Sequence, residues 1–119
     1  MSTTGRARAL QLLLGGAGVL HLVRPGTYDW MVPPELGPAR PWVTGTGVAE
    51  LATAALLTVP ATRRAGGWAA AGLFTAFLPA HLHSIRVLRG RPVAVALAVL
   101  RTPVQVPLLH AALRVARAR

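Results

Sequence analysis

Four long apolar blocks make up most of this 119-residue chain and constrain its fold more than any other feature. Their approximate bounds are 7–23, 42–59, 66–85 and 93–113. Each lies within the roughly 17–25 residues that an α-helix needs to cross the hydrocarbon core of a bilayer. No block shows a clean amphipathic stripe, as expected for helices surrounded by lipid. The sequence therefore predicts an all-α protein, a four-transmembrane-helix up-and-down bundle formed as one domain over residues 1–119.

The composition supports a lipid environment. Hydrophobic residues make up 53% of the chain and charged residues only 13%, about half of the charged fraction usual in soluble proteins. A domain of this size exposes much of its surface, so too few charges remain for a polar shell. Arginine replaces lysine throughout, which is typical of a GC-rich bacterial genome. We therefore expect a multi-pass protein of the bacterial inner (plasma) membrane, with the lipid bilayer as its main partner.

The positions of the arginines indicate an orientation. The net charge is +10, but most arginines lie between or beyond the apolar blocks instead of forming one basic face, which argues against nucleic-acid binding. With both termini inside, the inner segments hold Arg6, Arg8, Arg63, Arg64, Arg114, Arg117 and Arg119. The outer loops hold fewer, namely Arg24, Arg40, Arg86, Arg89 and Arg91. The positive-inside rule thus favours cytoplasmic termini.

The first loop, residues 24–41, is rich in proline. Its prolines are Pro25, Pro33, Pro34, Pro38 and Pro41. This density prevents a long helix and favours turns. The loop has two interpretations: a packed plug that caps the bundle, or a lid over a site. Within the later blocks, Pro79, Pro103 and Pro107 leave backbone carbonyls without their usual donors, which favours a kinked fourth helix.

Polar side chains inside the blocks mark a candidate site. Glu50 lies midway through the second block, where a carboxylate costs a few kcal/mol unless it is protonated, paired or faces a cavity. Thr46 lies one turn before it, and Arg101 and Gln105 are one turn apart in the fourth block. Glu50 and Arg101 lie at about the same depth, roughly 12 Å along their helices, so a buried pair between them is geometrically available if those helices face each other.

Histidines end two of the blocks on the same side of the membrane: His21 in the first, His81 in the third. Two interpretations of the polar residues remain open. They form a structural network that holds the helices together, or they form a functional site. In the second case Glu50 and His81 are the catalytic candidates. The ligand-binding candidates are His21, Thr46, Arg101 and Gln105. We predict no metal site, and nothing in the sequence specifically indicates haem.

Ordered motifs along the chain resemble the DoxX-like integral membrane proteins. They are Gly18-x-x-His21, Pro25, Tyr28, Val32-Pro33-Pro34, Gly47-Val48-Ala49-Glu50, Val59-Pro60, Arg63-Arg64, Pro79-Ala80-His81-Leu82-His83 and Leu100-Arg101-Thr102-Pro103-Val104-Gln105. The resemblance implies a four-helix bundle in a bacterial membrane, with recurrent polar positions at His21, Glu50, Arg101 and Gln105. One departure is His81, where the family usually has asparagine; the imidazole adds a titratable group.

Three functions remain open. The resemblance implies a membrane subunit of a redox assembly, because the family takes its name from a subunit of a thiosulfate:quinone oxidoreductase; quinone is then the candidate cofactor. The chain has no cysteine, so a partner subunit must carry the electrons. The alternatives are a small proton-coupled transporter that uses Glu50, and an isomerase-like membrane enzyme with Glu50 as base and His81 as acid on a hydrophobic small molecule. A homo-oligomer is also compatible with the sequence.

Overall fold

A computed structural model describes residues 2–118, and every regular element within this range is helical. The elements are α1 (Thr3–Val23), α2 (Gly26–Asp29), η1 (Pro34–Leu36), α3 (Ala39–Thr58), η2 (Pro60–Thr62), α4 (Arg63–Ala76), α5 (Leu78–Val87), α6 (Pro92–Arg101), η3 (Thr102–Val104) and α7 (Gln105–Ala116). The predicted all-α class is confirmed. Arg119, counted above among the inner arginines, lies outside the described residues.

The four apolar blocks correspond to helical segments, although the last two are interrupted. The first block is α1 and the second is α3, each a continuous helix. The third is divided at Phe77 into α4 and α5, with Pro79 in the first turn of α5. Proline disturbs the preceding turn because it lacks an amide hydrogen. In the fourth block a 3-10 turn around Pro103 separates α6 from α7, whereas Pro107 stays inside α7.

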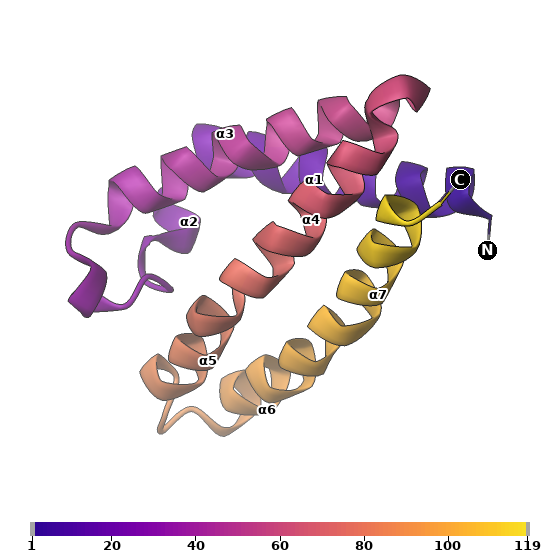
Figure 1. Ribbon diagram of the computed structural model, residues 1–119. Helices are drawn as coiled ribbons and strands as arrows, with labels where there is room; N and C mark the ends of the chain where they lie inside the picture. The colour runs from indigo at the N-terminus through magenta and orange to yellow at the C-terminus, as the bar shows by residue number, and fades with distance from the viewer. Residues whose placement is uncertain (1, 119) are drawn as a thin grey trace.

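The helices form two antiparallel hairpins that meet at one end of the molecule (Figure 1). In one hairpin α1 packs against α3, and in the other α4 and α5 run beside α7 and α6. The chain bends by 116° between α3 and the α4–α5 segment. The two termini and the α3–α4 turn lie together at the joined end, whereas the first loop and the α5–α6 turn lie at the separated ends (Figure 1). The four-transmembrane-helix up-and-down bundle predicted from the sequence is therefore not confirmed.

Small residues permit the close helix contacts within each hairpin. In the first, a Cβ atom added at Gly47 would lie 2.7 Å from the Cβ of His21, and one at Gly18 would lie 2.9 Å from the carbonyl oxygen of Gly47. In the second, a Cβ at Gly67 would lie 2.5 Å from the backbone nitrogen of Ala116. No real side chain fits at such distances, so glycine at these positions sets the helix separation.

The hydrophobic core lies where the two hairpins join. Its buried members come from α1, α3, α4 and α7: Ala7, Leu10, Leu14, Ala54, Leu57, Ala70, Ala71, Phe74, Ala112 and Val115. Many other large apolar side chains face outward, including Val93 at 76% exposure and Leu12 at 70%. A soluble domain rarely leaves this much apolar surface open.

One helical stretch, Pro92–Ala116, is long and apolar enough to cross a membrane, and a second candidate exists if Ala39–Thr58 and Pro60–Val87 count as one bent span. Only 6% of the most apolar window of Pro92–Ala116 is buried inside the molecule, unlike the core helix of a soluble protein. Helix α1 does not qualify; it carries Arg6, Arg8, Gln11 and His21 among its apolar residues. By length and composition, four crossings are not confirmed.

Candidate functional site

A buried histidine–glutamate pair lies between α1 and α3. The Nδ1 atom of His21 is 3.2 Å from Oε1 of Glu50. Glu50 is 1% exposed and His21 9%, so both polar side chains are enclosed by protein. The pair lies where Gly18 and Gly47 bring the two helices together, one turn before His21 and three residues before Glu50. The close helix approach thus places the imidazole and the carboxyl group in contact.

The hydrogen bonds of the pair are incomplete. Nδ1 of His21 lies 2.6 Å from the carbonyl oxygen of Ala17, one turn earlier in α1. Because a carbonyl oxygen can only accept, Nδ1 carries the ring hydrogen and donates a hydrogen bond to the Ala17 carbonyl oxygen. Oε1 of Glu50 lacks a hydrogen-bond partner among residues 2–118. A buried polar atom left in this state costs about 1–3 kcal/mol, and such atoms often mark a functional role or a missing ligand.

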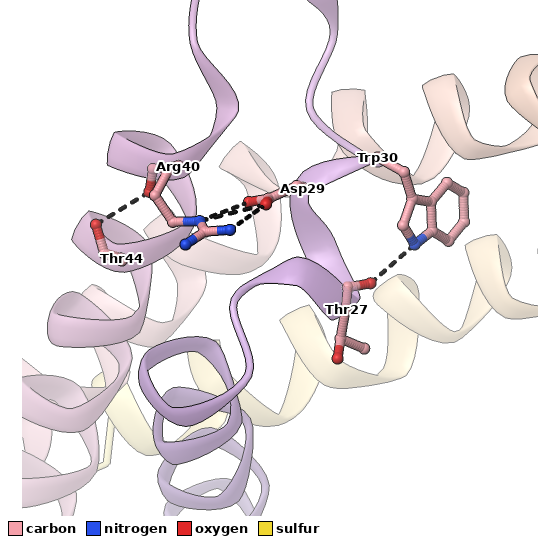
Figure 2. A network of polar contacts seen from close by, with 5 residues as sticks. All are labelled: Thr27, Asp29, Trp30, Arg40 and Thr44. Atoms are coloured by element: carbon pink, nitrogen blue, oxygen red, sulfur yellow. Dashed lines mark hydrogen bonds and ion pairs between the residues drawn. The ribbon is translucent and has the colours of Figure 1, made fainter.

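The first loop covers the pair with Tyr28. The Tyr28 ring stacks on the His21 ring, with centroids 3.8 Å apart and an interplanar angle of 10°. Figure 2 shows how the loop is held: the guanidinium of Arg40 faces the carboxylate of Asp29, at 2.8 Å between Nη2 and Oδ2. The indole nitrogen of Trp42 also donates to the carbonyl oxygen of Leu36 at 2.9 Å.

The loop therefore covers the His21 side of the His21–Glu50 pair. The sequence indicated either a plug or a lid for this loop and did not assign Tyr28 to the site. The available signal was the short distance along the chain, since Tyr28 follows His21 by seven residues. That spacing becomes a stacking contact only because α2 folds the chain back over the end of α1.

Tyr28 offers a spectroscopic test of this arrangement, because it is the chain's single tyrosine. Burial, and then the negative charge of Glu50, raise the pKa of the Tyr28 phenol above its ordinary value of 10.0. Tyrosinate absorbance of the folded protein should therefore rise at a higher pH than in the denatured chain. Glu50→Gln should lower the midpoint only partly, since burial remains. Equal midpoints in the folded and denatured chains would show that Tyr28 does not cover the site.

The raised pKa of Tyr28 determines how the free energy of unfolding changes with pH. Between the denatured and folded midpoints the unfolded chain has lost its phenol proton while the folded chain keeps it. The stability contribution of Tyr28 is thus fully present below pH 10 and is lost as pH rises through the folded pKa. Tyr28→Phe should remove this alkaline component of the unfolding profile.

A second polar cluster links the two helices of the other hairpin. Nε2 of Gln105, at the start of α7, donates to the carbonyl oxygen of Phe74 in α4 at 2.8 Å. Nη1 of Arg101 donates to Oε1 of the same glutamine at 3.0 Å. Gln105 is 6% exposed, whereas Arg101 is exposed. The cluster acts as a clamp between α4 and α7, in agreement with the structural interpretation of these residues.

The expected Glu50–Arg101 pair is absent, and this interpretation was wrong. Within residues 2–118 the short polar contact of Glu50 is with His21, and Arg101 bonds to Gln105. Equal depth in the membrane does not make two helices neighbours. Helix α3 packs against α1 and α4, while α6, which carries Arg101, packs against α5 and η3.

The remaining predicted site residues lie apart from the pair. His81 is on α5, which packs against α4, α6 and η3. Thr46 is on the same helix as Glu50, but its hydroxyl donates to the carbonyl oxygens of Trp42 and Val43 within that helix. Of the six candidates, the structure joins His21 with Glu50 and Arg101 with Gln105. Within the described chain, no group of three or more His, Asp or Glu side chains could hold a metal ion.

Fold and site together define a small all-α protein with a candidate membrane span and a buried His–Glu pair under an aromatic loop. The chain belongs to the family defined by a domain of unknown function, DUF8561, whose profile matches residues 10–116. The match includes both hairpins and the first loop. No curated protein and no solved structure matches the chain. The family description gives no activity, and the resemblance to DoxX-like proteins stays a prediction.

Proposed function

We propose that the protein is an integral protein of the bacterial inner membrane that crosses the bilayer four times, through α1, α3, α4–α5 and α6–α7, with cytoplasmic termini. The outward-facing apolar side chains support this, because Leu12 on α1 and Leu100 and Val106 on the α6–α7 segment are each 70% exposed. Lipid removes the cost of exposing them to water. The common end of the termini and the α3–α4 turn is the cytoplasmic side in this arrangement.

Within the membrane, we propose that the protein serves as a DoxX-like, quinone-linked subunit of a redox assembly. The observation that carries the proposal is the buried Glu50 carboxyl oxygen without a hydrogen-bond partner, next to an imidazole. A quinone oxygen accepts hydrogen bonds and takes up protons when the quinone is reduced. Tyr28, His21 and Glu50 bring a phenol, an imidazole and a carboxyl group next to one another. The phenol and the imidazole can donate to a quinone oxygen, and Glu50 can do so in its protonated form, so the donor set fits such a ligand.

In this function the chain's own residues handle protons and a partner subunit supplies electrons. His21 and Glu50 are each able to hold and release a proton. The Tyr28 ring excludes water from one side of the imidazole and orients it by stacking. The Ala17 carbonyl oxygen fixes the protonated Nδ1 edge of His21. A quinone held by these residues would supply two-electron, two-proton redox chemistry; His21 and Glu50 would then each pass one proton, and the partner subunit would supply the two electrons.

The test is to purify the protein with its native lipids and to measure bound quinone and associated subunits by extraction and mass spectrometry. We expect the wild type to retain isoprenoid quinone, and Glu50→Gln to lose most of it because the amide cannot exchange a proton. Glu35→Gln is the matched control: Glu35 is exposed in the first loop and its replacement should leave the quinone content unchanged. Wild-type protein without quinone and without a partner subunit would overturn the proposal.

A proton-coupled transporter is the second candidate, and one observation favours it. The chain contains three acidic residues, and of these Glu50 is buried. This is expected for a carboxyl group that exchanges substrate for protons. In proteoliposomes, substrate-driven proton release that disappears in Glu50→Gln would select this function over the first. The isomerase-like alternative loses its geometric basis, because His81 lies on the other hairpin from Glu50.

A further inference from the structure

The joined end of the two hairpins carries a basic groove that the proposed function does not use. It has a volume of about 460 Å³ and lies between the start of α1 and the end of α7. Its lining combines cations, a hydroxyl group and apolar side chains: Thr3, His110, Leu113, Arg114, Arg117 and Ala118. Arg114 and Arg117 are exposed. Arg114 lies in the last turn of α7 and Arg117 caps the end of that helix three residues later, so both guanidinium groups can reach one ligand.

None of the side chains that line the groove is acidic. The acidic residues of the chain are Asp29, Glu35 and Glu50, and the first two belong to the loop at the opposite end of the first hairpin (Figure 1). Within residues 2–118, no acidic side chain therefore competes with an anion in the groove. The guanidinium of Arg117 also lies 5.9 Å from the centroid of the Trp68 ring, which restrains the side chain at the edge of the groove.

We propose that this groove binds the headgroup of an anionic phospholipid. The phosphate lies between Arg114 and Arg117, and the acyl chains pass along the apolar side chains next to the groove, beginning at Leu113. Paired arginines are well suited to phosphate because their planar guanidinium groups bind its oxygens in a bidentate manner. Basic pockets between membrane helices on the cytoplasmic side bind such headgroups. The inference depends on the four-crossing part of the proposed function, and not on quinone binding.

The experiment measures lipid binding by native mass spectrometry from detergent micelles. Phosphatidylglycerol and phosphatidylcholine with the same acyl chains are added in parallel, and inorganic phosphate is a third arm. We expect phosphatidylglycerol to bind in preference to phosphatidylcholine, with no binding of inorganic phosphate at the same concentration. The double variant Arg114→Gln/Arg117→Gln should weaken phosphatidylglycerol binding roughly thirty-fold, from the loss of two charges near the surface.

The matched control is Arg86→Gln/Arg89→Gln, which removes two exposed arginines at the far end of the second hairpin and should leave the affinity unchanged. An equal loss in both double variants would mean non-specific attraction, and binding of inorganic phosphate as tight as lipid would mean a soluble-anion site. Either result overturns the inference. Unchanged helicity by circular dichroism confirms that the variants are folded.

The design separates this inference from the proposed function. A chain that stays monodisperse without detergent overturns the membrane placement and the lipid site together. A chain that needs detergent but shows no preference for phosphatidylglycerol overturns the lipid site alone. The Arg114→Gln/Arg117→Gln variant should also keep its quinone content, because the groove lies at the end of the molecule away from the loop that covers Glu50.

Discussion

Replacing Gly67 by alanine should destabilise the α4–α7 hairpin by about 1–3 kcal/mol, the usual cost of forcing extra atoms into a filled contact. The added Cβ would lie 2.5 Å from the nitrogen of Ala116, 2.8 Å from its Cα atom and 2.9 Å from the carbonyl oxygen of Ala112. All three are backbone atoms of α7, so no side-chain rotation relieves the clash. The two helices must move apart.

Gly72→Ala is the control on the same helix. A Cβ atom there meets no other atom within 4 Å, and alanine favours a helix over glycine by up to about 1 kcal/mol. Unfolding in mixed micelles with increasing dodecyl sulfate, followed by circular dichroism, should give a lower midpoint for Gly67→Ala. Gly72→Ala should match the wild type or exceed it. Equal midpoints for both variants would contradict the close contact between α4 and α7.

The second large effect is expected at the buried pair. His21→Leu removes the imidazole next to Glu50 and leaves the carboxyl group buried without its neighbour, which should cost roughly 1–3 kcal/mol. In the double variant His21→Leu/Glu50→Leu the remaining polar group is also gone. Two apolar side chains of similar size can replace a buried ionic pair with little loss. The double variant should therefore be more stable than His21→Leu alone.

The measurement is a double-mutant cycle in the same micelle unfolding assay. His83→Leu serves as the control, because this histidine lies on α5 in the other hairpin and its replacement should have little effect. Strictly additive losses for His21→Leu and Glu50→Leu would mean that the two side chains do not interact, and the site would then lack its basis.

Local features of the sequence predicted the helices well. Helix formation depends mainly on residues close together in the sequence. The apolar blocks therefore located α1 and α3 as continuous helices, with ends correct to within a few residues. Pro103 also correctly indicated where the fourth helix is interrupted. Proline lacks the amide hydrogen that would bond to the preceding turn, so its effect on the helix is local. The sequence did not show which glycines make close contacts or which helix each one meets.

The partners of the polar residues could not be predicted in the same way. Glu50 and Arg101 share a depth, and that made their pairing look favourable. Which helices pack together is decided by contacts far apart in the sequence, such as Gly18 against Gly47 and Gly67 against Ala116. These contacts divide the helices into two hairpins and place Arg101 away from Glu50. The role of Tyr28 depended similarly on how the loop folds back, which the Arg40–Asp29 ion pair helps to fix.

The most direct test is to count the membrane crossings. The chain has no cysteine, so each cysteine introduced for labelling is the sole reactive thiol of its variant. Single cysteines at Glu35, Ala61, Arg89 and Leu97 are treated in intact cells with a membrane-impermeant maleimide. We predict labelling at positions 35 and 89 in intact cells, labelling at 61 only after permeabilisation, and none at 97, although Leu97 is 64% exposed. Rapid labelling at 97, or at 35 and 61 from the same side, would contradict a four-crossing protein that holds His21 and Glu50 within the bilayer.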